Sequence, residues 1–151
     1  MRQRISAGVL IERNDSILLV RHQRRGRYDF WVAPGGGCEG LEDLETTAVR
    51  EVREECGLDI ALDRIAYIED LHNAALRILK VWFTGRIVGG TLYTGSAAAS
   101  AEHIVDAAFF GRAELAGKVV YPPALLNDYW RDRETGFAAP RYLGLRRMET
   151  E

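Results

Sequence analysis

The stretch from Gly36 to Leu58, entered through Ala33-Pro34-Gly35, constrains the fold of this chain more than any other part of it. Its first half, together with Gly35, holds the triplet Gly35-Gly36-Gly37, where a backbone without side chains can approach another group closely or adopt positive φ. Its second half has the pattern of an amphipathic helix that begins after Asp43 as N-cap and ends at Gly57. The sequence therefore predicts a glycine loop followed directly by one helix.

One edge of the predicted helix carries three carboxylates, Glu51, Glu54 and Glu55, within an arc of roughly 100°. Like charges at these spacings destabilise a helix, so the three acids need a compensating positive charge. A divalent cation supplies it, because carboxylate oxygens are ligands that magnesium prefers and magnesium often shares its coordination shell with substrate phosphates. Arg50 is predicted to bridge helix and loop and to orient the acids. The alternative interpretation is a solvated acidic helix face with a surface ion pair.

The spacing of these residues resembles the Nudix box in full. The order is Gly36, five residues, Glu42, seven residues, Arg50-Glu51-Val52, one residue, Glu54-Glu55, one residue, Gly57-Leu58, which covers 23 of the 151 residues. Leu41 stands where many members of the family have Gly. The resemblance implies a single Nudix domain over residues 1–151, with an α/β (α+β) fold built as an α/β/α sandwich around a mixed β-sheet.

The resemblance also implies a reaction, the attack of water on a nucleoside diphosphate linked to a group X. The products are a nucleoside monophosphate and phosphorylated X, and the cofactor is Mg²⁺, with Mn²⁺ as a substitute. Glu51, Glu54, Glu55 and the carbonyl of Gly35 are then the metal ligands. Gly36 and Gly37 bring backbone close to the substrate.

An acid outside the helix is expected to join the site. Nudix-like domains commonly place one just before a strand that ends in aromatic residues, and here residues 104–110 are such a strand. Glu102 is therefore the candidate, with His103 or Asp106 as substitutes. Glu54 or Glu102 acts as general base. Glu102, His103 and Asp106 also fit an ordinary solvated loop or strand.

Residues 22–31 form a basic segment interleaved with aromatic residues, predicted to be a loop. Arginine forks suit phosphates and aromatic faces suit bases, so this segment and the strand before it give candidate substrate contacts. The candidates are Arg21, Arg25, Arg27 and Trp31. A flexible solvated loop with Trp31 packed into the core is the alternative, and a nucleic-acid groove is a third interpretation.

Composition limits the classes of partner. The net charge of −2 argues against a dedicated nucleic-acid binder, whereas a small nucleotide substrate remains compatible. Cys38 and Cys56 form no disulfide framework and have no metal-ligand spacing, which is typical of reduced thiols. Residues 7–11 are too short an apolar run for a signal peptide, and no stretch reaches membrane-spanning length. We expect a cytoplasmic monomer or homodimer.

Periodicity predicts the remaining elements. The patterns indicate a β-hairpin (4–12 and 16–21, turning at Asn14-Asp15), three further strands (64–71, 76–88 and 104–110), a mobile loop (89–90 and 94–100), a short helix (112–116) and a last helix from Pro122-Pro123. The face Leu125, Leu126, Tyr129 and Trp130 of the last helix is expected to pack on the sheet. The tail from Phe137 is mixed, and its final residues are expected to fray.

The sequence does not identify the group X of the substrate. The coenzyme A pattern upstream of the box is matched only in part, with Ala33 where Phe is expected, and Asn73 stands where ADP-ribose members often have proline. These mismatches favour a nucleoside triphosphate as substrate or a loosely selective role. A nucleotide sugar is a further candidate substrate. The alternatives are a catalytically silent nucleotide-sensing module and an RNA 5′-end pyrophosphohydrolase. The complete acid set argues against the sensor, and the absence of a basic excess argues against the RNA enzyme.

Overall fold

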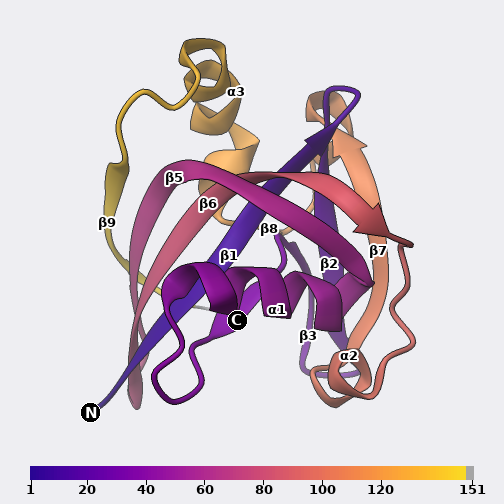
Figure 1. Cartoon of the computed structure of the whole chain (residues 1–151). Helices are drawn as coiled ribbons and strands as arrows, with labels where there is room; N and C mark the ends of the chain where they lie inside the picture. The colour runs from indigo at the N-terminus through magenta and orange to yellow at the C-terminus, as the bar shows by residue number, and fades with distance from the viewer. Residues whose placement is uncertain (149–151) are drawn as a thin grey trace.

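The computed structural model describes residues 1–148 as a strongly curled mixed β-sheet with helices on both sides (Figure 1). The strands are β1 (Arg2–Arg13), β2 (Ser16–Arg24), β3 (Tyr28–Val32), β4 (Gly35–Gly37), β5 (Leu58–His72), β6 (Leu76–Gly90), β7 (Ile104–Gly111), β8 (Val120–Tyr121) and β9 (Arg141–Arg147). The α-helices are α1 (Leu44–Cys56), α2 (Ala97–Ala101) and α3 (Asp128–Asp132), and three 3₁₀ turns are η1 (Arg112–Leu115), η2 (Pro123–Leu126) and η3 (Arg133–Thr135).

Strand β1 joins the two halves of the sheet. It pairs in parallel with β6 along most of its length, in antiparallel fashion with β4, and only at its last residues with β2. Beyond β6 the sheet continues to β5 and β9, and beyond β2 it continues to β3, β8 and β7. The two halves therefore diverge from β1 and leave room between them.

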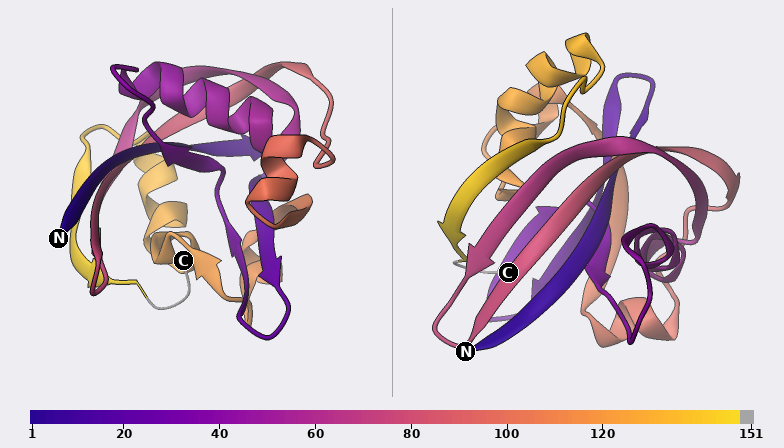
Figure 2. Two further views of the ribbon diagram at one scale, coloured as in Figure 1. Left: turned by 90° about the horizontal axis from the view of Figure 1, so that it is seen from below. Right: turned by 60° about the vertical axis from the view of Figure 1, so that its left-hand side comes forward.

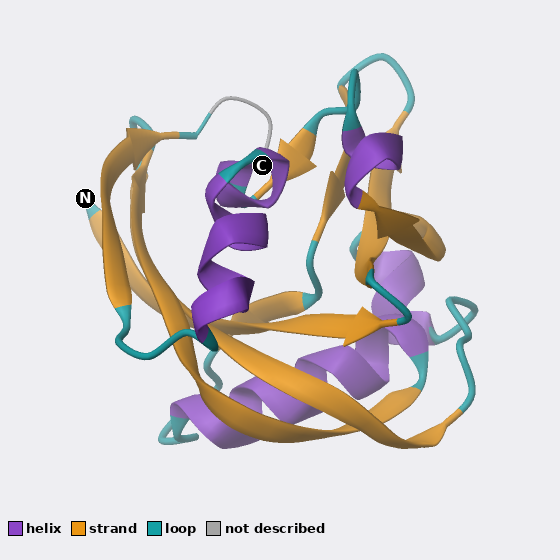
Figure 3. Ribbon diagram, turned by 90° about the horizontal axis from the view of Figure 1, so that it is seen from above, coloured by secondary structure: helices purple, strands orange, loops and turns teal. Residues whose placement is uncertain are grey.

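Apolar side chains form one core on each side of the sheet. The first contains Ala48, Val52 and Cys56 of α1, and the second contains Leu125 and Trp130 of the C-terminal helical segment. Seen from below and from above, α1 covers one face and the C-terminal helices lie on the other (Figures 2 and 3). The predicted α+β fold with helix, sheet and helix layers is confirmed.

The strongest periodic patterns predicted their elements correctly. The hairpin turns at Asn14 and Asp15, both with positive φ, which suits a two-residue turn between twisted strands. Strand β6 lies between β1 and β5, and its Trp82 and Phe83 are buried, as the apolar residues on both of its faces predicted. Strand β7 follows the predicted range closely.

Two predicted loops are paired strands. The basic segment 22–31 continues β2 to Arg24, turns over three residues and returns as β3, so it is largely a hairpin. The glycine triplet is the short strand β4, paired with Ser6, Ala7 and Gly8 of β1. Both predictions were wrong because these residues form strands by hydrogen bonding to partners elsewhere in the sheet. The local composition does not indicate such pairing.

The remaining differences lie in the C-terminal half. Part of the predicted mobile loop is α2, because the Ser96 side chain caps Ala99 and Ala99 is buried in the first core. The predicted last helix breaks at Asn127, which turns Leu126 outward while Leu125, Tyr129 and Trp130 stay buried.

The tail from Phe137, for which the sequence predicted no regular element, contains β9, which pairs in parallel with β5. The expected fraying of the final residues concerns 149–151, outside the described part of the chain, and the single-domain assignment stays a prediction. No helix among residues 1–148 is long and apolar enough to cross a membrane.

Candidate active site

Helix α1 is held at both ends by the residues that the sequence predicted. The Asp43 side chain accepts a hydrogen bond from the Thr46 amide at 2.7 Å, and Gly57 ends the helix in the left-handed conformation at φ 77°. Val52 and Cys56 anchor the helix in the first core. The rotation of the helix is thereby fixed, and it turns Glu51 and Glu55 inward toward β4.

Arg50 is the centre of an ion-pair network between the helix and the loop before it. Its guanidinium donates two hydrogen bonds to Glu42, both at 2.8 Å, one to Glu51 at 3.0 Å and one to Glu54 at 3.1 Å. A further bond reaches the carbonyl of Gly37 at 3.1 Å. The Arg50 guanidinium lowers the pKa of Glu42 to about 2, so Glu42 is ionised at neutral pH. Arg50 therefore orients two of the helix acids, as the sequence analysis predicted.

Glu51 and Glu55 are buried carboxylates, with 5% and 2% of their surfaces exposed. Oε2 of Glu55 accepts a hydrogen bond from the Gly35 amide at 3.0 Å, whereas Oε1 of Glu55 and Oε2 of Glu51 have no hydrogen-bond partner among the described residues. Burial raises the pKa of Glu51 and of Glu55, and the charge of Glu102 raises both further. Unpaired buried carboxylate oxygens are costly, so this pair is suited to a positively charged ligand.

The glycines of β4 allow the strand to lie directly against these carboxylates and against β1. A Cβ on Gly36 would come within 2.5 Å of the Glu51 carboxyl carbon, and one on Gly35 within 2.6 Å of the Ala7 carbonyl oxygen. A Cβ on Gly37 would collide with the Arg4 guanidinium. Close approach therefore explains Gly35 and Gly36, whereas the exposed Arg4 side chain could move away from a Cβ on Gly37, and none of the three glycines has positive φ.

The loop between β4 and α1 turns at Gly40, which has φ 55°, and Leu41 beside it is fully exposed. Glu42 nevertheless reaches Arg50 and also accepts a hydrogen bond from the Thr47 hydroxyl at 2.9 Å. Leu41 therefore leaves the contact between Glu42 and Arg50 intact.

A cavity of about 660 Å³ opens between the two halves of the sheet and reaches the glycine strand. It is lined at that end by Gly35, Gly36, His22 and Glu102. The carboxylates of Glu51 and Glu55 lie next to the two glycines at its edge, although these residues do not line it. The volume lies within the range of ligand sites for small molecules, roughly 300–1,000 Å³.

The sequence model of the family described as NUDIX domain matches residues 2–128. This chain belongs to the Nudix family. Its Arg50, Glu51, Glu54 and Glu55 thus lie in the Nudix box of a Nudix fold.

Curated relatives match mainly in the part around the box. The uncharacterized Nudix hydrolase YvcI of Bacillus subtilis is 43% identical over 58 residues, 38% of this chain and 34% of YvcI. Diphosphoinositol polyphosphate phosphohydrolase 3-alpha of Mus musculus is 46% identical over 54 residues, 36% of this chain and 32% of the relative. The match spans about a third of the length of these two proteins. An ADP-ribose pyrophosphatase of Methanocaldococcus jannaschii is 26% identical over 127 residues, 81% of this chain and 70% of that protein.

Solved Nudix structures share the architecture along nearly the whole chain. A NUDIX hydrolase from Nitrosomonas europaea superposes with a TM-score of 0.74 at 26% identity, covering 93% of each chain. An ADP-ribose pyrophosphatase from Streptococcus suis gives a TM-score of 0.67 at 26% identity, covering 92% of this chain and 98% of the other.

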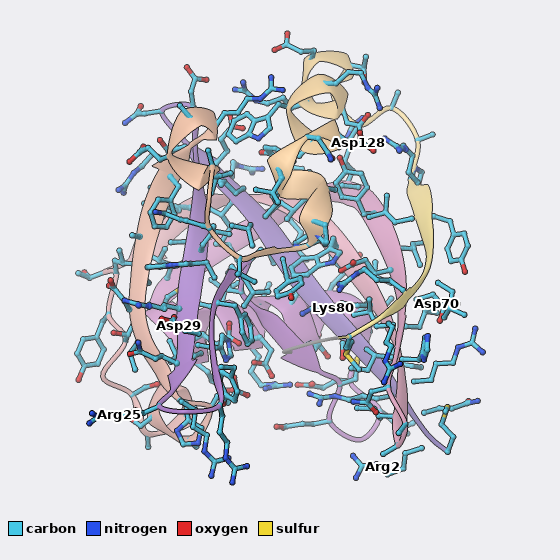
Figure 4. The ribbon with its side chains drawn as sticks, turned by 180° about the vertical axis from the view of Figure 1, so that it is seen from behind. Arg2, Arg25, Asp29, Asp70, Lys80 and Asp128 are labelled. Atoms are coloured by element: carbon cyan, nitrogen blue, oxygen red, sulfur yellow. The ribbon has the colours of Figure 1, made fainter. Side chains whose placement is uncertain are left out.

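The candidate substrate contacts in the Nudix chain divide between the two faces of the β2–β3 hairpin. Arg27 lines the cavity. Arg21 and Trp31 are absent from its lining, because side chains alternate along a strand: Arg21 binds Asp29 through two hydrogen bonds of 2.8 and 2.7 Å, and Trp31 packs on Phe110. Arg25 lies at the outer end of the turn and points away from the cavity (Figure 4). Of the four candidate contacts, Arg27 alone therefore lies at the cavity.

The other faces of β2 and β3 carry cavity residues that sequence reasoning missed. His22 and Phe30 face the cavity, and the Phe30 ring meets Tyr121 edge to face at 5.5 Å. Lys80 points into the space between the halves of the sheet from β6 and lies over the Trp82 ring at 4.3 Å (Figure 4). Side chains alternate along a strand, so a longer predicted β2 would have placed His22 on the face opposite Arg21. The segment was instead predicted to be a loop, where the side chains have no such alternation.

The far part of the cavity contains a second buried acid. Glu69 is 3% exposed and accepts hydrogen bonds from Trp82 Nε1 at 2.9 Å and from Arg146 at 3.1 Å. Arg4, Arg27 and Lys80 add positive charge to the same walls. The cavity therefore combines cations suited to phosphates with aromatic surface suited to a base.

Proposed function

We propose that this protein hydrolyses the diphosphate linkage of a nucleoside diphosphate joined to a group X, giving a nucleoside monophosphate and phosphorylated X. The observation that carries the proposal is the pair of unpaired buried carboxylate oxygens, on Glu51 and Glu55, beside a cavity of nucleotide size. Burying two carboxylate oxygens without hydrogen-bond partners costs free energy, and a cation bound beside them would offset that cost.

The residues present fit a divalent cation, Mg²⁺ or Mn²⁺. Glu51, Glu54 and Glu55 would hold it together with the carbonyl of Gly35, because all are hard oxygen donors on neighbouring elements. When bound, such a cation polarises phosphoryl oxygens and lowers the pKa of a coordinated water.

The protein's own groups prepare the site for this chemistry. Arg50 fixes the orientation of Glu51 and Glu54 and ties them to the glycine strand. Arg27 and Lys80 lie where they can neutralise phosphate charge, and Phe30 and Tyr121 offer ring surface to a base. Glu54, which is 39% exposed, or Glu102 takes the proton of the attacking water.

A panel of substrates tests the proposal. The protein is incubated, with and without Mg²⁺, with each of ADP-ribose, NADH, dinucleoside polyphosphates, dNTPs and capped RNA. The products are treated with a phosphomonoesterase, and the released phosphate is measured. We expect Mg²⁺-dependent release from at least one small nucleotide. ADP-ribose belongs in the panel because two of the relatives above are named ADP-ribose pyrophosphatases. Release from capped RNA alone would favour the RNA 5′-end enzyme, and no release from any compound would favour the nucleotide sensor.

Replacing Gly36 with alanine should weaken Mn²⁺ binding by about 10- to 100-fold, the scale expected when a ligand loses its orientation. The new methyl group would occupy the position of the Glu51 carboxylate and force it to move. Titration of Mn²⁺ by electron paramagnetic resonance measures the effect. Gly89→Ala is the control, because a Cβ there meets Asp59 at an ordinary 3.5 Å. Equal Mn²⁺ affinity of Gly36→Ala and wild type would show that the Glu51 carboxylate is not held in place by this contact.

A further inference from the structure

His22 approaches the acids of the site from the opposite half of the sheet. Ligand atoms of His22, Glu55 and Glu102 all lie within 4.8 Å of one another. The three come from β2, from α1 and from the residue after α2, so the fold rather than the local sequence brings them together. A histidine and two carboxylates at this spacing make a candidate cation site with mixed nitrogen and oxygen ligands.

The His22 ring is held in place by the Phe30 ring. The two rings stack with centroids 5.2 Å apart and planes 4° from parallel. This stacking restricts the orientation of the His22 ring beside Glu55 and Glu102, and a fixed ring orientation favours metal binding by histidine.

The alternation of side chains along β2 explains how His22 comes to face the acids. His22 pairs with Phe30 in an unbroken ladder with β3, so it lies on the face opposite Arg21. The bulge beside it lies on β7, where the register shifts from Asp106 to Ile104.

A second observation points independently to a ligand at this place. Glu55 is 98% buried, and its Oε1 has no hydrogen-bond partner among the described residues. A protonated Glu55 would still leave a hydroxyl without an acceptor, whereas a cation between His22, Glu55 and Glu102 satisfies the oxygen directly.

We propose that His22 supplies an imidazole nitrogen to a divalent cation that Glu55 and Glu102 also bind, so that this site prefers a transition metal such as Zn²⁺ or Co²⁺ to Mg²⁺. The inference rests on the proposed function, because it places its cation at the same group of acids. Nitrogen ligands raise the affinity of a site for later first-row metals, while Mg²⁺ selects oxygen.

His22→Gln tests the proposal through metal affinity rather than activity. Zn²⁺ and Mg²⁺ are each titrated into the metal-free protein, with a competing chelator for Zn²⁺. We expect Zn²⁺ binding to fall by about 10- to 100-fold and Mg²⁺ binding to change less than about threefold. The matched control is His103→Asn, since His103 lines the same cavity but lies outside the cluster, and asparagine tolerates its φ of 59°.

The unmodified protein gives a second readout that does not depend on the folding of a variant. The chain has three histidines, so ¹⁵N spectra of the imidazoles are simple to assign in the metal-free and Zn²⁺-loaded states. We expect an imidazole nitrogen of His22 to shift and His103 to stay unchanged. An unshifted His22, or an equal loss of Zn²⁺ and Mg²⁺ affinity in His22→Gln, would overturn the inference.

The inference and the proposed function fail in different ways. If Mg²⁺ binding is lost in Glu51→Gln while Zn²⁺ binding is indifferent to His22→Gln, the carboxylate site stands and the histidine ligand is rejected. If the wild-type protein hydrolyses no nucleotide yet Zn²⁺ shifts His22, the metal site stands and the proposed reaction is rejected.

Discussion

Replacing Glu55 with glutamine should lower the kcat of nucleotide hydrolysis by about a thousandfold, the upper range for removing one preorganised charged group from a site. Glu55 is the most buried of the helix acids and has an unpaired oxygen beside the cavity. Glutamine keeps the volume and removes the charge that a cation needs. The loss should therefore appear in kcat with Mg²⁺ saturating, and also as weaker Mg²⁺ binding.

The same substitution should stabilise the metal-free protein by about 1 kcal/mol, because it removes a buried charge without a counter-ion. Burial raises the folded-state pKa of Glu55 above the usual 4.5. The folded protein therefore binds more protons than the unfolded chain above pH 4.5, and its free energy of unfolding falls as the pH rises through that window. Glu55→Gln should flatten this dependence. Saturating Mg²⁺ should remove most of the difference by stabilising the wild type.

Urea unfolding at several pH values and steady-state kinetics measure the two effects. Glu45→Gln is the matched control, since it removes one negative charge from an exposed position of the same helix. We expect Glu45→Gln to differ little from the wild type in both assays. A Glu55→Gln protein with wild-type turnover would reject the role of Glu55 in metal binding.

The helix and its acids could be predicted from the sequence because every signal that specifies them is local. Asp43 and Gly57 cap one element, and the spacing of Arg50 and Glu54 follows from helix geometry alone. The burial of Glu51 and Glu55 could not be predicted from local signals. It arises from β4, where Gly36 has no side chain that would displace the Glu51 carboxylate and the Gly35 amide donates a hydrogen bond to Glu55.

The cavity depends on pairings between residues far apart in the sequence, which no local pattern contains. Strand β1 pairs in parallel with β6, about 75 residues later in the chain, and this pairing places Ser6 opposite Lys80 at the cavity wall. His22 faces the site because β2 pairs with β3 up to Arg24, and Tyr121 meets Phe30 through the two-residue strand β8. Sequence reasoning therefore placed the acids on their helix and missed most of the residues that line the cavity.

Replacing Arg50 with methionine should impair both stability and activity, because one guanidinium serves three carboxylates and a carbonyl. Breaking a fully buried ion pair costs roughly 3–5 kcal/mol. Arg50 is 19% exposed, so solvent screens part of the loss and we expect about 2 kcal/mol. Glu42 would no longer have its pKa held at about 2, so the stability that its ionisation contributes above pH 4.5 would be lost at neutral pH as well.

Arg50→Lys separates charge from geometry in the same network. Lysine keeps the positive charge, but its ammonium cannot reproduce the forked contacts of the guanidinium with Glu42. We expect Arg50→Lys to recover part of the stability and little of the activity, with kcat still about a hundredfold below wild type because Glu51 and Glu54 are no longer oriented. Arg53→Met and Arg53→Lys are the controls, since Arg53 lies on the same helix, is 67% exposed and pairs with Asp59 outside the site. If Arg50→Lys restores wild-type kcat, charge alone suffices and the orienting role of Arg50 is wrong.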